Sequence, residues 1–490
     1  MAERVLLTHS YFYKYDQKQW KMHQPFPPLM TITAAALLRE NGFEVGLFDV
    51  GLKNSPEEIQ QHLESFAPDF LVLVDDGFNY LTKMCLTTMR SAAFRMQEYG
   101  RRYGARVITA SSDATDHYEK YLDHGADVVI RGEPEMTLLE LLKHGDTFEE
   151  QPGIAYRAGK KTILNQPRPI MTVLDELPLP AWDLVDINSY RKEWSRGRQP
   201  FYLNIATTRG CPYKCNWCAK PIYGNRYNSR SPTYVVDEIE LHLKHHQVEH
   251  FWMCDDIFGL KPGWVEAFGE ELEARQLKIR YKIQSRADLL LKENTIDNLV
   301  KSGLDEVWIG AESGSQKILD DMEKGTTLHQ IETASKMLKA KGVKVGFFIQ
   351  YGYLGETMND IKKTLHLIKR LMPDRLGISV SYPLPGTGFY NKVMKDADTK
   401  HNWVDSSDLD MMFSNTYSPI FYRTLHRYTH LIYHIQKGRN TIWSLLTHPV
   451  FPDLSMIKSV AKAVIYLPLC LYKWVAIQYL SRSPITDHEE

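Results

Sequence analysis

The chain has 490 residues and a formal net charge of −1, so its overall charge does not indicate a nucleic-acid partner. Six cysteines in this length are ordinary usage for a reducing compartment. The first residues, MAERVLLTHSYF, lack the charged-then-apolar pattern of a secretory signal. We therefore expect a cytoplasmic protein of about two or three domains.

Residues 1–147 alternate between strand and helix patterns. Helices are expected at Pro27–Leu38, Ser55–Phe66 and Tyr80–Tyr103. The expected strands are Arg4–Thr8, Phe43–Val50, Phe70–Val74, Arg106–Ala110 and Asp127–Ile130. This alternation predicts an α/β domain with a flavodoxin-like, doubly wound parallel sheet, in which ligands bind at the C-terminal ends of the strands.

Two segments of this domain resemble the cobalamin-binding domain that precedes many radical S-adenosylmethionine (SAM) barrels. They are PPLMTITAAALLRENGFEVGLFDV and ASSDATDHYEKYLDHGADVVIRGEPE. The resemblance implies that cobalamin binds to the loops after the strands. The cobalamin contacts that it implies are Ser111, Ser112, Asp113, Gly132 and Glu133. An α/β domain that is structural or binds another ligand is the alternative.

One motif of other cobalamin proteins is absent from this domain. The sequence D-x-H-x-x-G, which supplies a histidine to cobalt in those proteins, does not occur. We therefore expect no histidine ligand to replace the lower ligand of cobalamin. His9, His117 and His124 are interpreted as solvated surface residues.

Residues 148–195 are expected to form a linker with a β-hairpin and a proline-rich, semi-rigid connector. Residues 196–395 contain strand patterns that are each followed by a helical pattern. The expected strands are Phe201–Thr207, His250–Cys254, Arg280–Gln284, Glu306–Gly310, Val343–Gln350 and Arg375–Ser381. They predict a (βα)6 partial barrel with its functional residues at the C-terminal strand ends.

The run TTRGCPYKCNWC places Cys211, Cys215 and Cys218 directly after the first barrel strand. Three closely spaced thiolates can hold three irons of a [4Fe-4S] cluster and leave the fourth iron open. A closed zinc site is the alternative, but no fourth Cys or His follows at zinc-finger spacing. The spacing, with Trp217, resembles the cluster loop of the radical SAM superfamily, which implies that SAM binds the open iron.

The same resemblance assigns SAM contacts to residues after the next three barrel strands. It implies that Asp255 or Asp256 accepts hydrogen bonds from the SAM ammonium group, that Arg286 pairs with the SAM carboxylate or ribose, and that Glu312 is a polar SAM contact. A solvated carboxylate pair and an ordinary ion pair between Arg286 and Asp288 are the alternatives.

Two further residues follow the last two barrel strands. Glu356 and Tyr382 are interpreted first as part of the barrel architecture and second as substrate contacts. Each barrel motif is weak alone, but their order behind a three-cysteine loop makes the combined pattern specific.

Residues 396–490 match no family motif and are expected to be mostly helical. Between Arg423 and Arg482, eight Lys or Arg residues occur with one acid, Asp453. The apolar run Ala463–Leu480 is interrupted by Pro468 and Lys473, and a spanning helix needs about twenty apolar residues. We therefore expect an interfacial helix on an anionic membrane at its inner face, with packing against the barrel as the alternative.

The whole pattern up to about residue 395 resembles the anaerobic magnesium-protoporphyrin monomethyl ester cyclases and their cobalamin-dependent methyltransferase relatives. This implies a radical SAM enzyme that uses a [4Fe-4S] cluster, SAM, cobalamin and an electron donor such as flavodoxin or ferredoxin. We favour methylation of an unactivated carbon in a lipophilic or secondary-metabolite substrate. Oxidative cyclisation, RNA modification and a non-catalytic cofactor-binding role are the alternatives.

Overall fold

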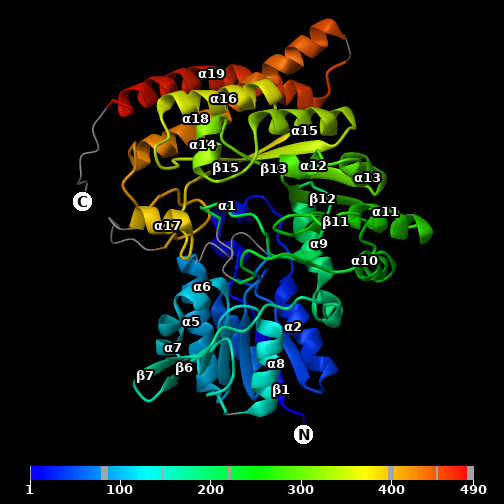
Figure 1. The fold of residues 1–490 in the computed structure, drawn as a ribbon, viewed down its shortest axis with the longest axis vertical. Helices are drawn as coiled ribbons and strands as arrows, with labels where there is room; N and C mark the ends of the chain where they lie inside the picture. Colours follow the sequence, from blue (N-terminus) through cyan, green and yellow to red (C-terminus); the bar gives the residue numbers. More distant parts are fainter. Residues whose placement is uncertain are drawn as a thin grey trace.

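The computed structural model describes residues 2–78, 86–145, 147–218, 222–394, 402–448 and 451–482. The N-terminal sheet lies at one end of the molecule, the barrel lies in the middle, and two long C-terminal helices lie at the far end (Figure 1). These three parts therefore follow one another in space in the same order as along the chain.

The N-terminal sheet has seven strands in the order β2-β1-β3-β4-β5-β6-β7. Its first five strands are parallel: β1 (Arg4–Thr8), β2 (Glu44–Phe48), β3 (Phe70–Val74), β4 (Arg106–Ala110) and β5 (Val128–Ile130). The predicted flavodoxin-like topology is confirmed. The β-hairpin expected after residue 148 is also present, as β6 (Ile154–Ala158) and β7 (Lys161–Leu164). It extends the first sheet because β6 pairs antiparallel with β5.

Helices cover both faces of this sheet, as the fully buried strand β3 requires. One face packs under α2 (Leu29–Glu40) and α8 (Pro134–His144). The other packs under α3 (Ile59–Phe66), α5 (Thr87–Arg102) and α7 (Tyr118–Asp123). Residues 80–85 of the helix predicted over Tyr80–Tyr103 lie outside the described residues.

The barrel sheet has six strands in the order β15-β14-β13-β12-β11-β8, and all neighbours are parallel. The strands are β8 (Leu203–Ile205), β11 (His250–Met253), β12 (Arg280–Ser285), β13 (Leu304–Glu312), β14 (Lys344–Tyr351) and β15 (Arg375–Val380). The predicted (βα)6 partial barrel is confirmed. A short antiparallel ribbon, β9 (Thr208–Arg209) with β10 (Asn228–Ser229), flanks the cysteine loop.

The outer layer of the barrel consists of helices that alternate with these strands. They are α10 (Pro232–His246), α11 (Trp264–Ala274), α12 (Ala287–Leu290), α13 (Thr295–Lys301), α14 (Gln316–Asp321), α15 (Leu328–Ala340) and α16 (Met358–Leu371). Shorter helices lie in the connections: α1 (Gln17–Trp20), α6 (Ser112–Asp116), α9 (Ile187–Arg196) and α17 (Gly388–Val393).

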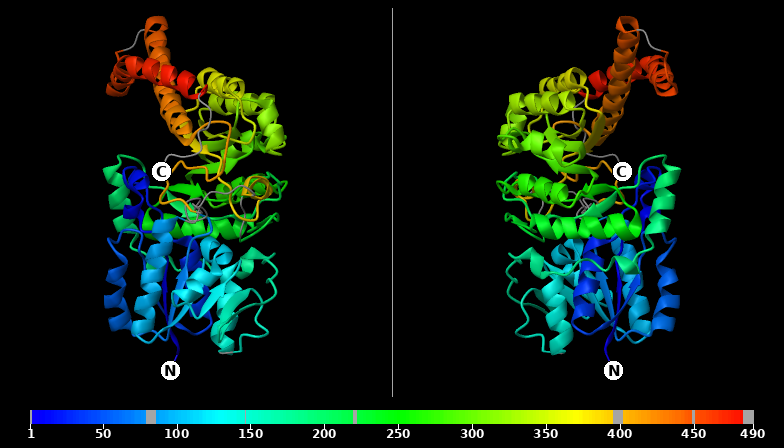
Figure 2. Two further views of the ribbon diagram at one scale, coloured as in Figure 1. Left: turned by 90° about the vertical axis from the view of Figure 1, so that its left-hand side faces the viewer. Right: turned by 90° about the vertical axis from the view of Figure 1, so that its right-hand side faces the viewer.

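The chain ends in a hairpin of two long helices, α18 (Pro419–Thr447) and α19 (Leu454–Leu480). The first half of α18 packs beside the barrel, where the Tyr433 hydroxyl donates to the Pro373 carbonyl at 2.7 Å. The other end of the hairpin projects from the body of the molecule (Figure 2). Pro468 lies inside α19 without ending it.

Candidate active site

The cysteine loop lies between the barrel and the N-terminal domain, on the chain between β9 and β10. Gly210 opens the loop with φ +77, and a Cβ atom there would lie 2.4 Å from the Arg226 carbonyl oxygen. Only glycine fits this turn without strain. Cys211, Cys215 and Cys218 are half-buried, and none of them is in a disulfide. No three His, Cys, Asp or Glu side chains converge at metal-binding distances within the described ranges.

Two buried cations face this loop. One Nη of Arg286 lies 3.8 Å from the Cys215 sulfur and donates to the Lys324 carbonyl at 2.7 Å. The Arg286 guanidinium also stacks on the Tyr213 ring at 3.7 Å and pairs with Asp288 at 3.0 Å. Arg286 therefore makes the ion pair with Asp288, the alternative weighed in the sequence, while it also lies beside a cysteine.

Lys324 is the second cation, and the sequence patterns did not predict it. Its Nζ lies 2.8 Å from a Glu312 carboxylate oxygen, and the two residues are 7% and 4% exposed. Burial opposes the charge on Lys324, but Glu312 and then Cys215 outweigh it and raise its pKa. Lys324 therefore stays charged and links Glu312 to the cysteine loop.

Glu312 has a strained backbone that turns its side chain toward Lys324. Its φ is +55, and a β-bulge interrupts the pairing of β13 with β14 between Gly310 and Glu312. Non-glycine residues rarely adopt this conformation, and such strain is concentrated at functional sites. A Cβ atom on Gly310 would lie 2.6 Å from both the Glu312 carboxylate and the Lys324 nitrogen, so glycine makes room for the ion pair.

Asp255 and Asp256 lie after β11 but differ in environment. Asp255 is 1% exposed and accepts from the Thr207 and Thr208 amides at 2.7 and 2.8 Å and from the Thr207 hydroxyl at 2.5 Å. Burial raises its pKa to about 7, against these hydrogen bonds. Asp255 thus anchors the segment before the cysteine loop, whereas Asp256 is exposed. A SAM contact remains a prediction for either residue.

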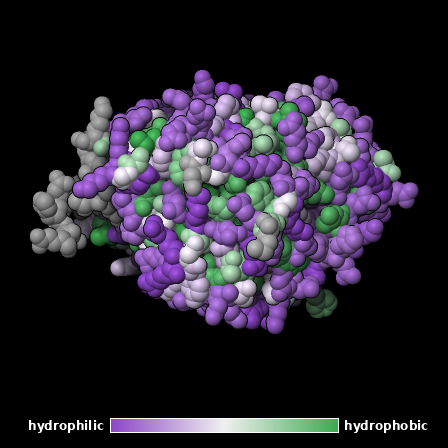
Figure 3. Space-filling model, turned by 90° about the horizontal axis from the view of Figure 1, so that it is seen from below, coloured by the Kyte–Doolittle hydropathy of each residue, from purple (hydrophilic) through white to green (hydrophobic). Residues whose placement is uncertain are grey.

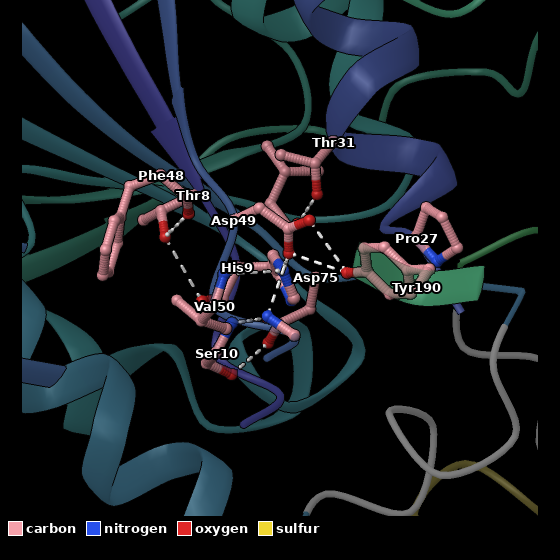
Figure 4. A network of polar contacts seen from close by, with 12 residues as sticks. Thr8, His9, Ser10, Pro27, Thr31, Phe48, Asp49, Val50, Asp75 and Tyr190 are labelled. Atoms are coloured by element: carbon pink, nitrogen blue, oxygen red, sulfur yellow. Dashed lines mark hydrogen bonds and ion pairs between the residues drawn. The ribbon is translucent and has the colours of Figure 1, made fainter. Parts of the chain in front are cut away.

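Polar side chains also gather at the C-terminal ends of the N-terminal strands (Figure 4). His9 Nε2 lies 2.9 Å from Asp49, and the Tyr190 hydroxyl donates to the same carboxylate at 2.8 Å. His9 is 5% exposed, so its interpretation as a solvated residue was wrong. Burial opposes the Asp49 charge, but the hydrogen bonds, led by His9, hold its pKa below the usual range. Asp75 accepts from the Ser10 amide at 2.6 Å and from its hydroxyl at 2.8 Å.

The remaining cobalamin contacts that the resemblance implied lie after β4 and β5. The Ser111 hydroxyl caps α6 by accepting from the Ala114 amide at 2.8 Å, and Ser112 is buried beside it. Asp113 pairs with Arg90 at 2.5 Å. Its carboxylate is therefore already engaged within the domain, so it orients the loop.

Gly132 and Glu133 follow β5 and reach the barrel. Gly132 has φ +100 and open space beside its Cα. The Arg209 guanidinium pairs with Glu133 at 3.0 Å and with Glu135 at 2.6 Å, and all three side chains are at least nine-tenths buried. Arg209 lies two residues before Cys211. This ion-pair network therefore ties the start of the cysteine loop to the N-terminal domain.

The chain is similar to known proteins in sequence and in fold. The model of the radical SAM superfamily matches residues 205–368. An uncharacterised methyltransferase of Pyrococcus horikoshii is 29% identical over 58% of this chain and 62% of its own length. The chain thus spans less than two thirds of that relative.

Two further relatives are covered more fully. The anaerobic magnesium-protoporphyrin IX monomethyl ester cyclase of Rubrivivax gelatinosus is 25% identical over 82% of this chain and 72% of its own length. The hopanoid C-3 methylase of Methylococcus capsulatus is 23% identical over 89% of this chain and 82% of its own length.

Solved structures share the fold of nearly the whole chain. The cobalamin-dependent radical SAM enzyme OxsB, with aqua-cobalamin bound, matches with a TM-score of 0.70 and 19% identity over 98% of this chain and 72% of its own. The radical SAM methyltransferase TsrM of Kitasatospora setae, with cobalamin and a [4Fe-4S] cluster bound, matches with a TM-score of 0.65 and 17% identity over 81% and 75%. Residues 205–368 are therefore a radical SAM domain, and the chain as a whole has the fold of cobalamin-dependent radical SAM enzymes.

Proposed function

We propose that this protein is a radical SAM enzyme that uses a [4Fe-4S] cluster and cobalamin to methylate an unactivated carbon of a lipophilic substrate. The observation that carries the proposal is the position of the cysteine loop. Arg209, two residues before Cys211, pairs with Glu133 after β5 of the N-terminal sheet. Arg286 after β12 of the barrel lies 3.8 Å from the Cys215 sulfur, and Lys324 interacts electrostatically with the same residue. The loop of three cysteines therefore lies between the C-terminal ends of both parallel sheets. Ligands of α/β sheets bind at these strand ends.

The residues present fit both cofactors. Three thiols outside any disulfide, with two buried cations nearby, suit an anionic cluster with one open iron. Open space beside Gly132 allows a bulky ligand to approach the main chain of the N-terminal domain. When bound, the cluster supplies the electron for reductive cleavage of SAM, and cobalamin supplies a transferable methyl group.

The protein's own residues bind and orient these groups. Cys211, Cys215 and Cys218 would hold the cluster, and Arg286 would present its guanidinium to a carboxylate next to it. The Glu312–Lys324 pair places fixed charges at the same barrel end. Arg209 pairs with Glu135 and holds the start of the cysteine loop against the N-terminal domain.

Methyl transfer is favoured over cyclisation because two relatives are named as methyltransferases or methylases and the matching TsrM structure is of a methyltransferase. The cyclase relative supports oxidative cyclisation as the second candidate. RNA modification of the methylthiotransferase type is less supported. That group carries three further cysteines in its N-terminal domain, and this one has only Cys85, which lies outside the described residues.

Anaerobic reconstitution tests the proposal. Wild-type protein loaded with iron, sulfide and cobalamin should bind about four irons and one corrinoid per chain. With a low-potential reductant, or reduced flavodoxin or ferredoxin, it should convert SAM to methionine and 5′-deoxyadenosine. Zinc at full occupancy with no reconstitutable iron would contradict the cluster, and failure to retain any corrinoid would contradict the N-terminal assignment.

The exposed surface of α19 supports a membrane-surface location. The helix is long and apolar enough to cross a membrane, and most of its apolar surface is exposed. Only a seam with seven-residue spacing, Ala463, Cys470 and Ile477, is buried, against α18. Its exposed large side chains include Leu454, Ile457, Val464, Ile465, Leu467, Leu469, Leu471, Tyr472, Val475 and Tyr479. The surface at the opposite, N-terminal end is mostly hydrophilic (Figure 3).

We infer that this hairpin lies on an anionic membrane at the inner face. The eight cations between Arg423 and Arg482 complement anionic lipid, each contributing roughly 1 kcal/mol near the surface. Apolar burial of α19 adds a part that salt does not screen. A membrane-bound enzyme would meet a lipophilic substrate directly.

Flotation with vesicles of phosphatidylcholine and phosphatidylglycerol tests this location. Full-length protein should float and be partly released by high salt, whereas L467E/L471E should remain in solution. The control V173E changes an equally exposed apolar residue, 53% against 52% and 62%, and should float like wild type. If wild type stays in solution and sediments as an oligomer, α19 is an interface between copies of the chain.

A further inference from the structure

The inner face of the barrel sheet exposes an aromatic side chain. Phe348 is 36% exposed although it lies in the middle of β14. Its neighbours Phe347 and Ile349 are 0% and 1% exposed and belong to the core under the outer helices. Because side chains alternate along a strand, Phe348 points to the opposite, inner face.

Phe348 is the exposed member of an aromatic stack. Its ring stacks on that of Trp308 on β13, with centroids 4.7 Å apart and planes 24° apart. The indole nitrogen donates to Glu306 at 2.8 Å, which fixes the ring. The stack therefore has a set orientation before any ligand arrives.

Two glycines allow this stack to lie against the sheet. Gly346 is the register partner of Trp308, and a Cβ atom there would lie 2.5 Å from the indole ring. Gly377 is the register partner of Phe348, and a Cβ atom there would lie 3.2 Å from both rings. The two rings thus pack directly on the backbone at positions that have no side chain.

The stack borders the candidate active site. Phe348 is in register with Gly310, so the two lie about 4.8 Å apart across the strands. Gly310 is the residue that makes room for the Glu312–Lys324 pair. A ligand on the open face of Phe348 would therefore lie beside the ion pair that adjoins Cys215.

The protein fills the other half of the inner face with its own aromatic rings. Lys282, on the inner face of β12, is surrounded by four rings within 5.5 Å of its nitrogen: Phe26, Trp194, Tyr202 and Trp252. Flat rings thus cover the sheet over β11 and β12. Over β13 and β14, the aromatic layer consists of Trp308 and Phe348, and the outer surface of Phe348 is exposed.

We propose that the Trp308–Phe348 stack is a binding platform for a flat, apolar ring system, which forms part of the substrate. The platform gives a conjugated or fused ring a face to stack on. A flexible acyl chain has no ring to stack on the phenyl ring and would gain less. The role of the bound ring as substrate rests on the proposed function, whereas its binding does not.

The test uses 2-naphthol and 1-decanol, which have ten carbons each but differ in shape, and full-length protein. Affinities are measured by naphthol fluorescence and by displacement of naphthol with decanol. Wild type should bind naphthol more tightly than F348L by about two- to twelvefold, the range expected for one aromatic stacking contact. F348Y, which keeps the ring, should stay within about twofold of wild type.

Two further variants separate the platform from general surface effects. G377A should weaken naphthol binding because the added methyl group displaces both rings. M337L changes an exposed side chain on the outer helix α15 and should bind naphthol like wild type. Thermal unfolding confirms that each variant is folded. Equal naphthol affinity in folded F348L and wild type, or tighter binding of decanol than of naphthol, would overturn the platform.

Formation of 5′-deoxyadenosine by wild type is measured separately. If SAM is not cleaved but naphthol binding depends on Phe348, the proposed function fails and the platform stands. If SAM is cleaved but naphthol binding is indifferent to Phe348, the proposed function stands and the platform is wrong.

Discussion

In both sheets, a buried aspartate accepts hydrogen bonds from the loop that follows the first strand. The two loops differ in the side chains that surround them. In the N-terminal domain, Asp75 after β3 accepts from Ser10 after β1. In the barrel, Asp255 after β11 accepts from Thr207 and Thr208 after β8. Each aspartate comes after the strand that pairs with the first strand of its domain.

The two edges differ in the side chains that surround the anchored loop. In the N-terminal domain, His9 and Asp49 satisfy each other, as do Arg90 and Asp113. In the barrel, Arg286 and Lys324 bring positive charge to a loop of three cysteines. The C-terminal end of the N-terminal sheet thus has its charged side chains already paired, which suits a large ligand held by shape. The C-terminal end of the barrel sheet has sulfur atoms and positive charge, which suit an anionic metal centre.

The cysteines should show the largest effect. C211A, C215A and C218A should each abolish the [4Fe-4S] signal in electron paramagnetic resonance and SAM cleavage, because each removes a corner ligand. The control C254A removes a buried thiol that lies on the barrel wall and should retain the cluster. If C211A, C215A or C218A kept its full iron content, the three cysteines would not be the cluster ligands, and the contrast between the two sheets would not hold.

Lys324 should show the next largest effect. K324M leaves Glu312 buried without its partner, which should cost roughly 3 kcal/mol of unfolding free energy in denaturant titration. Lys336, whose side chain is 68% exposed, pairs with Glu332. K336M should therefore lower the unfolding free energy by less than about 0.5 kcal/mol. The double variant K324M/E312Q should recover much of the loss. Equal effects of K324M and K336M would mean that no charge is buried at this edge.

The sequence predicts the strands of both sheets, but it does not predict which side chains pair at their C-terminal ends. Buried apolar runs such as Phe70–Val74 and Arg106–Ala110 coincide with β3 and β4. Lys324 could not be predicted because it comes after a short helix and meets Arg286 across 38 residues. His9 was misread because its partner Asp49 lies 40 residues away and the strand register that joins them has no local signal.

Glu356 is a third buried carboxyl at the C-terminal end of the barrel sheet, and it should make the stability of the protein depend on pH. Glu356, expected to be architectural, is 0% exposed and accepts from the Gly352 amide at 2.7 Å, and no partner of its other oxygen is present among the described residues. Burial raises its pKa to about 8. The folded state therefore binds more protons than the unfolded state between about pH 4.5 and pH 8.

This extra proton in the folded state makes Glu356 destabilising at alkaline pH. Glu356 should lower the unfolding free energy progressively as pH rises from about 4.5 to 8, with the loss complete above pH 8. E356Q keeps the shape without the charge, so it should be more stable than wild type by about 4 kcal/mol at pH 8.5 and by less than about 1 kcal/mol at pH 5. E266Q, an exposed control on α11, should behave like wild type. Parallel curves for E356Q and wild type would show that Glu356 does not titrate on folding.

His9 should show the smallest effect on cofactor binding, although it lies at the edge where cobalamin is proposed. Its Nε2 lies 2.9 Å from the Asp49 carboxylate, so coordination through this nitrogen would have to break a buried hydrogen bond at a cost of about 1 to 3 kcal/mol. Protein loaded with Co(II) cobalamin should therefore show no histidine nitrogen hyperfine splitting in electron paramagnetic resonance, and H9A should give the same spectrum. Splitting in wild type that disappears in H9A would mean that this edge supplies a metal ligand after all, and the contrast between a shape-defined edge and a ligand-defined edge would not hold.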